Sequence, residues 1–221
     1  MMQKRNEVEA GAGKMLEEER EKARKTVLCL LNCGCRFLDE NLLFSDCSLP
    51  QNIKHILWEK AAAIGKAWVD QYWNTEANAT ENLYRLGAVH IRFMSPMEEC
   101  AYHARALYDP DGSQIMISRS RLEEMSSIQE ELDLYLFTED SLRERLLAHE
   151  CFHFLEEKKG QHLNEIFSKE YGFSTNVLSP CRDIGAQAFV NQALGDPPAQ
   201  AVDIMWLAVK APEKLPKMEE I

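Results

Sequence analysis

The amino-acid sequence predicts an α+β fold that is mostly helical and carries a small sheet. Three observations favour this class: amphipathic helical segments at the start, a short strand and a hairpin in the middle, and helical periodicity again from Arg119 onward. Because the strands lie close together rather than alternating with helices, the order does not fit a repeating βαβ array. We expect a helical region at 1–86 packed on a core at 87–221, the two forming one compact unit.

The first 86 residues predict three helices. Residues 14–43 and residues 51–73 place apolar side chains at helical spacing, with charged residues between them. The first of these segments is broken by Ser48-Leu49-Pro50. A shorter helix at about 76–86 is expected to end at Gly87, since glycine is common directly after a helix.

The middle of the chain predicts strands. Residues 88–94 alternate apolar and polar side chains, which is typical of a strand with one buried face. Segments 104–108 and 115–118 flank Asp109-Pro110-Asp111-Gly112-Ser113, and proline and Asp-Gly at such a place are turn chemistry. We therefore expect a β-hairpin across 104–118.

Composition excludes several classes of protein. The chain has 221 residues, 45% of them hydrophobic, with 25 basic and 36 acidic residues and a formal net charge of −11. This is globular composition, and the acidic balance argues against a protein that coats nucleic acid or anchors to a membrane surface through basic residues. Seven cysteines, an odd number, suggest reduced thiols. With no apolar run near the start or of membrane-spanning length, we expect a cytoplasmic protein.

One segment carries chemistry. Ser141 and Glu144 have the spacing of a capping box, and Gly160 is a plausible helix end, so the residues between them predict one helix. His149 and His153 are then one turn apart on the same face. Two imidazole nitrogens placed in this way can converge on one Zn²⁺, with bonds of about 2.0–2.1 Å.

The motif His149-Glu150-Cys151-Phe152-His153, with its apolar flanks, resembles the zincin metallopeptidases. Glu150 directly follows the first histidine, where it can act as general base on a zinc-bound water. The resemblance implies a zincin-like core in which this helix lies beneath a small sheet, and an edge strand that pairs with an extended peptide substrate. The hairpin at 104–118 is the candidate for that edge.

A catalytic zinc needs a third protein ligand. Residues 154–159 lack the downstream histidine pattern of the metzincins, which leaves a gluzincin-like arrangement with an acid on a second helix. A second helix is predicted to begin at Pro180 and to end near Gly195, and Asp183 is the acid that it carries. We prefer Asp183 as the third ligand, and Glu165 is the alternative.

The stretch Ala186-Gln187-Ala188-Phe189-Val190 is weakly similar to compact metallopeptidases of the ImmA/IrrE type. In that group a glutamate stands directly before this pattern, whereas this chain has Gly185 there. Asp183 lies about 200° around the helix from that position. Gln187 is a candidate to orient a ligand histidine. Candidates to stabilise an oxyanion remain open among His103, His162, Tyr102, Tyr108 and Tyr171.

The leading hypothesis is a zinc metallopeptidase that hydrolyses peptide bonds in a peptide or protein substrate. Its Zn²⁺ would be held by His149, His153 and Asp183, with Glu150 as general base and no further cofactor. No nucleic-acid or membrane partner is expected, and the oligomeric state is left open. One alternative is a zincin-fold regulatory or binding protein with little or no peptidase activity. Another is a helical interaction protein in which the motif is coincidental.

Overall fold

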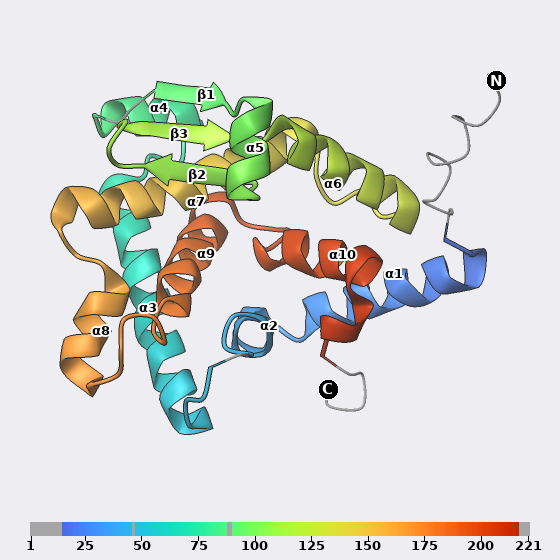
Figure 1. Cartoon of the computed structure of the whole chain (residues 1–221), viewed down its shortest axis with the longest axis horizontal. Helices are drawn as coiled ribbons and strands as arrows, with labels where there is room; N and C mark the ends of the chain where they lie inside the picture. Colours follow the sequence, from blue (N-terminus) through green and yellow to red (C-terminus); the bar gives the residue numbers. More distant parts are fainter. Residues whose placement is uncertain (1–14, 46, 88–89, 217–221) are drawn as a thin grey trace, which may run out of the picture.

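The computed structural model describes residues 15–45, 47–87 and 90–216 of the chain (Figure 1). Its helices are α1 (Glu17–Asn32), α2 (Cys35–Leu42), α3 (Gln51–Tyr72), α4 (Ala79–Arg85), α5 (Pro96–Tyr102), α6 (Arg119–Leu132), α7 (Glu139–Lys159), α8 (Leu163–Tyr171), α9 (Pro180–Leu194) and α10 (Gln200–Lys210), followed by the short 3₁₀ helix η1 (Pro212–Lys214). The strands are β1 (His90–Phe93), β2 (Ala106–Asp109) and β3 (Gln114–Ile117).

The three strands form one small mixed sheet. β3 lies between the other two, parallel to β1 and antiparallel to β2. The predicted hairpin is confirmed, with Tyr108 of β2 opposite Ile115 of β3. The prediction of a mostly helical α+β chain with a small sheet is likewise confirmed. Because β2 is at an edge of the sheet and packs against α7, it brings main-chain groups close to the helix that carries the histidines (Figure 1).

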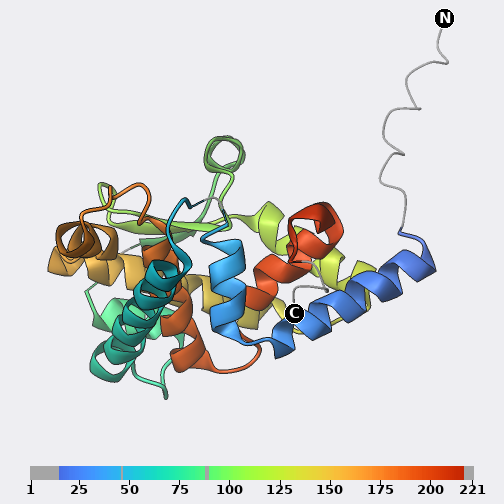
Figure 2. The ribbon, with the colours of Figure 1, turned by 90° about the horizontal axis from the view of Figure 1, so that it is seen from below.

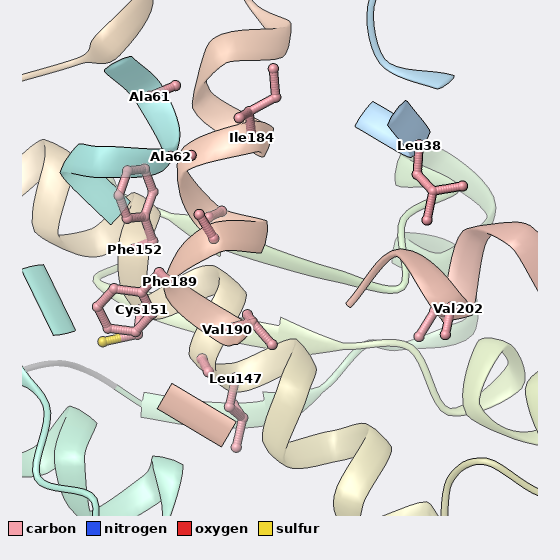
Figure 3. Packing of buried hydrophobic residues seen from close by; sticks show 14 of the residues in the cluster. Leu38, Ala61, Ala62, Leu147, Cys151, Phe152, Ile184, Phe189, Val190 and Val202 are labelled. Carbon is pink, nitrogen blue, oxygen red and sulfur yellow. The ribbon is translucent and has the colours of Figure 1, made fainter. Parts of the chain in front are cut away.

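The core is built around α3, α7 and α9. Phe152 of α7 stacks against Trp68 of α3, with ring centroids 4.9 Å apart, and lies 6.1 Å from the ring of Phe189 of α9. Figure 3 shows Phe152 and Phe189 in this cluster, together with the buried Cys151 and Leu147 of α7. These contacts hold the motif helix against the second helix, so both elements that carry the candidate site are fixed by apolar packing.

The first two helices cover a different part of the molecule. Helix α1 packs on α10 and α6, and Figure 2 shows it lying beside α10. Helix α2 connects to the core through Asp39, whose carboxylate accepts hydrogen bonds from Trp58 Nε1 at 2.7 Å and from Gln200 Nε2 at 2.8 Å. Burial is the main cause that raises the pKa of Asp39 to about 7, although these two hydrogen bonds lower it.

Two predictions about helix boundaries are wrong. The single helix expected at 14–43 is two helices, because Gly34 takes φ 84°, a conformation that side chains other than glycine rarely adopt; residue 14 lies outside the described residues. The motif helix begins three residues earlier than its capping-box pattern predicts. Thr138 caps it by accepting from Ser141 N at 3.1 Å, and Glu144 instead accepts from Ala79 N.

The strand expected at 88–94 is β1 over its described part, with residues 88 and 89 outside the described residues. Helix α5 was not predicted, although its start signal is present. Ser95 accepts from Glu98 N, Glu98 reaches back to Ser95 N, and Pro96 occupies the first helical position. The helices expected at 51–73 and 76–86 are confirmed as α3 and α4, to within three residues at each end.

No helix within 15–45, 47–87 or 90–216 is both long enough and apolar enough to cross a bilayer.

Candidate metal centre

Helix α7 places the two histidines of the motif side by side. Their Nε2 atoms are 3.2 Å apart, as expected for residues separated by one turn on one face. The intervening Cys151 and Phe152 are fully buried, so the opposite side of this turn is anchored in the core. The imidazoles therefore project together from a rigid helix.

Helix α9 adds Asp183 to the pair. Asp183 Oδ1 lies 3.7 Å from His149 Nε2 and 3.8 Å from His153 Nε2. In a tetrahedral zinc site with bonds of about 2.0–2.1 Å, neighbouring ligand atoms are about 3.3 Å apart. The three atoms thus already lie within about half an ångström of a zinc-binding triangle. In the described part of the chain, this is the one group of three or more His, Cys, Asp or Glu side chains that meets the spacing of a metal site.

The orientation of α9 is set by close contact of two glycines. A Cβ on Gly65 of α3 would lie 2.2 Å from the carbonyl oxygen of Gly185, and a Cβ on Gly185 would lie 2.6 Å from Phe152 Cζ. Position 185 therefore faces the core, where no larger side chain fits. This orientation turns Asp183 toward the histidines. The glutamate position of the ImmA/IrrE pattern is thus closed to a side chain here, while Asp183 is presented to the site.

A buried carboxylate orients His153. Glu156 is fully buried, and its Oε2 lies 2.9 Å from His153 Nδ1. The same oxygen accepts from Arg182 Nε at 2.9 Å, and Oε1 accepts from Leu163 N at 2.9 Å. Because an ionised Glu156 can only accept, Nδ1 of His153 donates to it, and Nε2 is the nitrogen that faces His149 and Asp183.

The charges in this group stabilise one another. Burial raises the pKa of Glu156, but its hydrogen bond to His153 and the nearby cations outweigh this, so its pKa is lowered. Burial lowers the pKa of His149, yet the contact with Asp183 and the charge of Glu150 raise it above its ordinary value. Burial raises the pKa of Asp183, but the contact with His149 outweighs this effect, so the pKa of Asp183 is lowered overall. The raised pKa of His149 and the lowered pKa of Asp183 both come from the attraction between these two side chains.

Glu150 is held against the sheet. Its side chain is 6% exposed, and its Oε2 accepts a hydrogen bond from Tyr108 N of β2 at 2.8 Å. Directly before β2, Arg105 O accepts a hydrogen bond from the N–H of Ser118, the residue directly after β3. Since main-chain groups alternate along a strand, those of Ala106 and Tyr108 point away from β3. The free edge of β2 therefore faces the motif helix and fixes the carboxylate of Glu150.

A cleft of about 900 Å³ opens above His149 and Glu150. The start of β2 lines it through Ala106, α10 through Val202 and Trp206, and the segment around Leu42 closes another side. The cleft is large enough for several residues of an extended peptide.

No family model, curated protein or solved structure matches this chain. The resemblance to zincins therefore rests on the motif and remains a prediction.

The remaining sequence candidates lie in different places. Glu165 is exposed on α8 and is not part of the cluster. Gln187 makes no hydrogen bond to either histidine and instead donates to Asp203 at 3.5 Å. Among the five candidates for oxyanion stabilisation, His103 alone lines the cleft. The other four, Tyr102, Tyr108, His162 and Tyr171, are not among its lining residues.

Sequence reasoning missed the roles of Glu156 and Arg182. Glu156 contacts the nitrogen of His153 that faces away from the cluster. A signal was present, because Glu156 is three residues after His153 and such pairs meet on a helix surface. Arg182, next to Asp183, carried no comparable signal, since its contact depends on how α9 packs on α7.

Proposed function

We propose that this protein is a zinc-dependent peptide hydrolase of the zincin type. The observation that carries the proposal is the convergence of His149 Nε2, His153 Nε2 and Asp183 Oδ1, from two helices, at separations of 3.2, 3.7 and 3.8 Å. Two imidazoles and one carboxylate suit a catalytic zinc, because three protein ligands leave one position for water or substrate. Glu156 supports this assignment by orienting His153.

Bound Zn²⁺ would supply a Lewis acid that activates water and polarises the peptide carbonyl. Glu150 takes the proton of the attacking water and passes it to the leaving nitrogen. The hydrogen bond from Tyr108 N holds Oε2, so Oε1 is the oxygen that moves the proton. The low exposure of Glu150 keeps bulk water from competing for this oxygen.

The substrate is proposed to lie along the free edge of β2. The main-chain groups of Ala106 face away from β3, and Ala106 lines the cleft next to His149 and Glu150. An extended peptide added to this edge gains affinity from main-chain hydrogen bonds, which suits a peptide substrate. We assign the activity to the cytoplasm as part of the proposal, supported by the odd number of cysteines.

The test combines metal content with hydrolysis of a peptide mixture followed by mass spectrometry. Glu150→Gln should keep one equivalent of zinc and lose hydrolysis by about a hundredfold or more. Asp183→Asn should lose zinc, whereas Glu165→Gln, the matched control on α8, should keep both zinc and activity. Hydrolysis retained in Glu150→Gln contradicts the proposal. Wild-type protein with less than about half an equivalent of zinc favours the regulatory alternative.

A further inference from the structure

The cleft beside the metal cluster has a wall of accessible apolar side chains. Five large apolar residues of its lining are half-buried rather than buried: Leu42, Leu43, Leu146, Trp206 and Leu207. They come from the end of α2, from α7 and from α10. Large apolar side chains that stay accessible together in one concave site are typical of a surface that binds a ligand.

Helix α7 connects this wall to the metal cluster. His153, His149 and Leu146 are separated by four and three residues, so they lie along one face of the helix. His149 and Leu146 both line the cleft, and they are about 4.5 Å apart along the helix axis. The apolar wall therefore begins within one turn of a candidate metal ligand.

Helix α9 enters the cleft in the same way. Asp183, Gln187 and Val190 have the same spacing along one face of the helix, and Gln187 and Val190 line the cleft. Since α7 and α9 pack against each other, the two rows of residues lead together from the metal cluster into the cleft. An extended peptide advances about 3.3 Å per residue, so a side chain on this wall belongs to a residue directly next to the bond at the metal.

Helix α10 contributes one face to the cleft. Val202, Asp203, Trp206 and Leu207 line it, and spacings of three and four residues place them on the same side of the helix. Asp203 is ion-paired with Arg105, which precedes β2. The other three side chains of this face are apolar, so α10 extends the apolar wall that Leu146 begins.

Two arginines of the lining are paired within the protein. Arg105 is paired with Asp203, and Arg121 is paired with Glu124 at 2.7 Å. Lys214 of η1 also lines the cleft, but it is exposed, so water solvates its charge. A charged substrate side chain would compete with these pairs, whereas an apolar side chain can contact the wall without breaking them.

Arg145 directs its charge away from this wall. It is 6% exposed, its Nη1 donates to Gly195 O at 3.1 Å, and its guanidinium lies 5.4 Å from the centroid of the Phe137 ring. Gly195 and Phe137 are not among the lining residues of the cleft. The cleft therefore favours an uncharged, apolar side chain.

We propose that the wall formed by Leu146, Trp206 and Leu207 binds one bulky apolar side chain of the substrate, such as that of leucine or phenylalanine. This side chain belongs to the residue directly next to the cleaved bond. Removing its carbon atoms from water supplies the affinity, and the internal ion pairs of the cleft disfavour charged side chains at the same place. The position relative to the cleaved bond rests on the proposed function.

The test uses full-length Glu150→Gln protein loaded with zinc, which binds substrate without turning it over. The probes are alanine pentapeptides with blocked ends, in which the third residue is leucine, phenylalanine, alanine, aspartate or lysine. Isothermal titration calorimetry measures their affinities. The leucine and phenylalanine peptides should bind about tenfold more tightly than the alanine peptide, because their additional carbon atoms leave water. The aspartate and lysine peptides should bind no more tightly than the alanine peptide.

Leu207→Glu in the same background should remove the preference for leucine and phenylalanine. The control is Lys210→Glu, which makes the exposed side of α10 more negative outside the cleft lining and should keep the preference. Equal affinity of all five peptides overturns the inference, and so does an equal loss in both variants. The comparison among peptides uses an unaltered wall, so it stands even if Leu207→Glu does not fold.

Wild-type protein with zinc is then incubated with a complex peptide mixture, and mass spectrometry locates the cleaved bonds. A bulky apolar residue should be enriched at one of the two positions next to the cleaved bond. If nothing is hydrolysed but the leucine peptide binds more tightly, the proposed function fails and the apolar site holds. Hydrolysis without any such enrichment gives the reverse. Absence of peptide preference together with a dimer that Leu207→Glu dissociates would assign the wall to a second copy of the chain and overturn the inference.

Discussion

Replacing Glu156 with glutamine should weaken zinc binding while the protein stays folded. The change conserves size, so the packing around this fully buried side chain is retained. What changes is hydrogen bonding, because Glu156 accepts from three donors: His153 Nδ1, Arg182 Nε and Leu163 N, each at 2.9 Å. A glutamine has one acceptor oxygen and one donor amide, and it cannot accept on both sides.

The expected magnitude follows from these contacts. If the glutamine oxygen faces His153, its amide opposes the N–H of Leu163; in the other orientation, the amide opposes His153 and Arg182. Either way a buried donor loses its acceptor, which costs about 1–3 kcal/mol of unfolding free energy. Loss of the carboxylate that orients a ligand histidine reduces metal affinity about 10- to 100-fold.

Zinc affinity is measured by competition with a chromogenic chelator, and stability by urea unfolding of the same samples. The control is Glu157→Gln, because Glu157 is half exposed and contacts His162 rather than a candidate ligand. It should change stability by less than about 0.5 kcal/mol and leave zinc affinity unchanged. If Glu156→Gln folds and binds zinc as tightly as the wild type, the role assigned to Glu156 is refuted.

Three further predictions concern the rest of the fold. Gly65→Ala should destabilise the protein by about 1–3 kcal/mol in urea unfolding, because the new Cβ would lie 2.2 Å from Gly185 O. Without that clash, alanine would stabilise the helix by about 1 kcal/mol relative to glycine. A gain in stability would therefore refute the close contact of the two helices. The pKa of Asp39 is raised to about 7 in the folded state from an ordinary value of 3.8, so the contribution of Asp39 to stability should rise by up to about 4 kcal/mol as pH falls from 8 to 4. The wild type should therefore gain stability relative to Asp39→Asn over this range, and an equal pH dependence of the two proteins contradicts the prediction. Burial raises the pKa of Cys151 to about 12, so its thiol should stay protonated and unreactive at pH 8. Iodoacetamide at this pH should modify the exposed Cys100 and spare Cys151 in the folded protein. Rapid labelling of Cys151 would contradict its burial.

Local sequence signals predicted the elements that depend on local physics. Helical spacing, the turn residues at 109–113, Pro180 and Gly160 each act within a few residues, and the elements that they indicate are present. The close approach of the Nε2 atoms of His149 and His153 was also predictable, because residues four apart on one helix lie on the same face, one turn from each other.

Features that depend on tertiary packing were not accessible in the same way. The sequence suggested Asp183 but could not determine whether α9 would turn position 183 or position 185 toward the histidines. That orientation follows from the contact between Gly65 and Gly185, which are 120 residues apart in the chain. The hydrogen bonds of Glu156 with Arg182 and of Glu150 with Tyr108 also join separate elements. Single-sequence periodicity carries no information on such contacts.

We propose that one zinc ion is held by two imidazoles and one carboxylate, from His149, His153 and Asp183. Zinc-edge X-ray absorption of the full-length protein with one equivalent of zinc identifies these ligands. We expect two imidazole nitrogens and oxygen ligands at about 2.0–2.2 Å, with one imidazole signal lost in His153→Ala. Sulfur ligands at about 2.3 Å, or a spectrum that His153→Ala leaves unchanged, would contradict it.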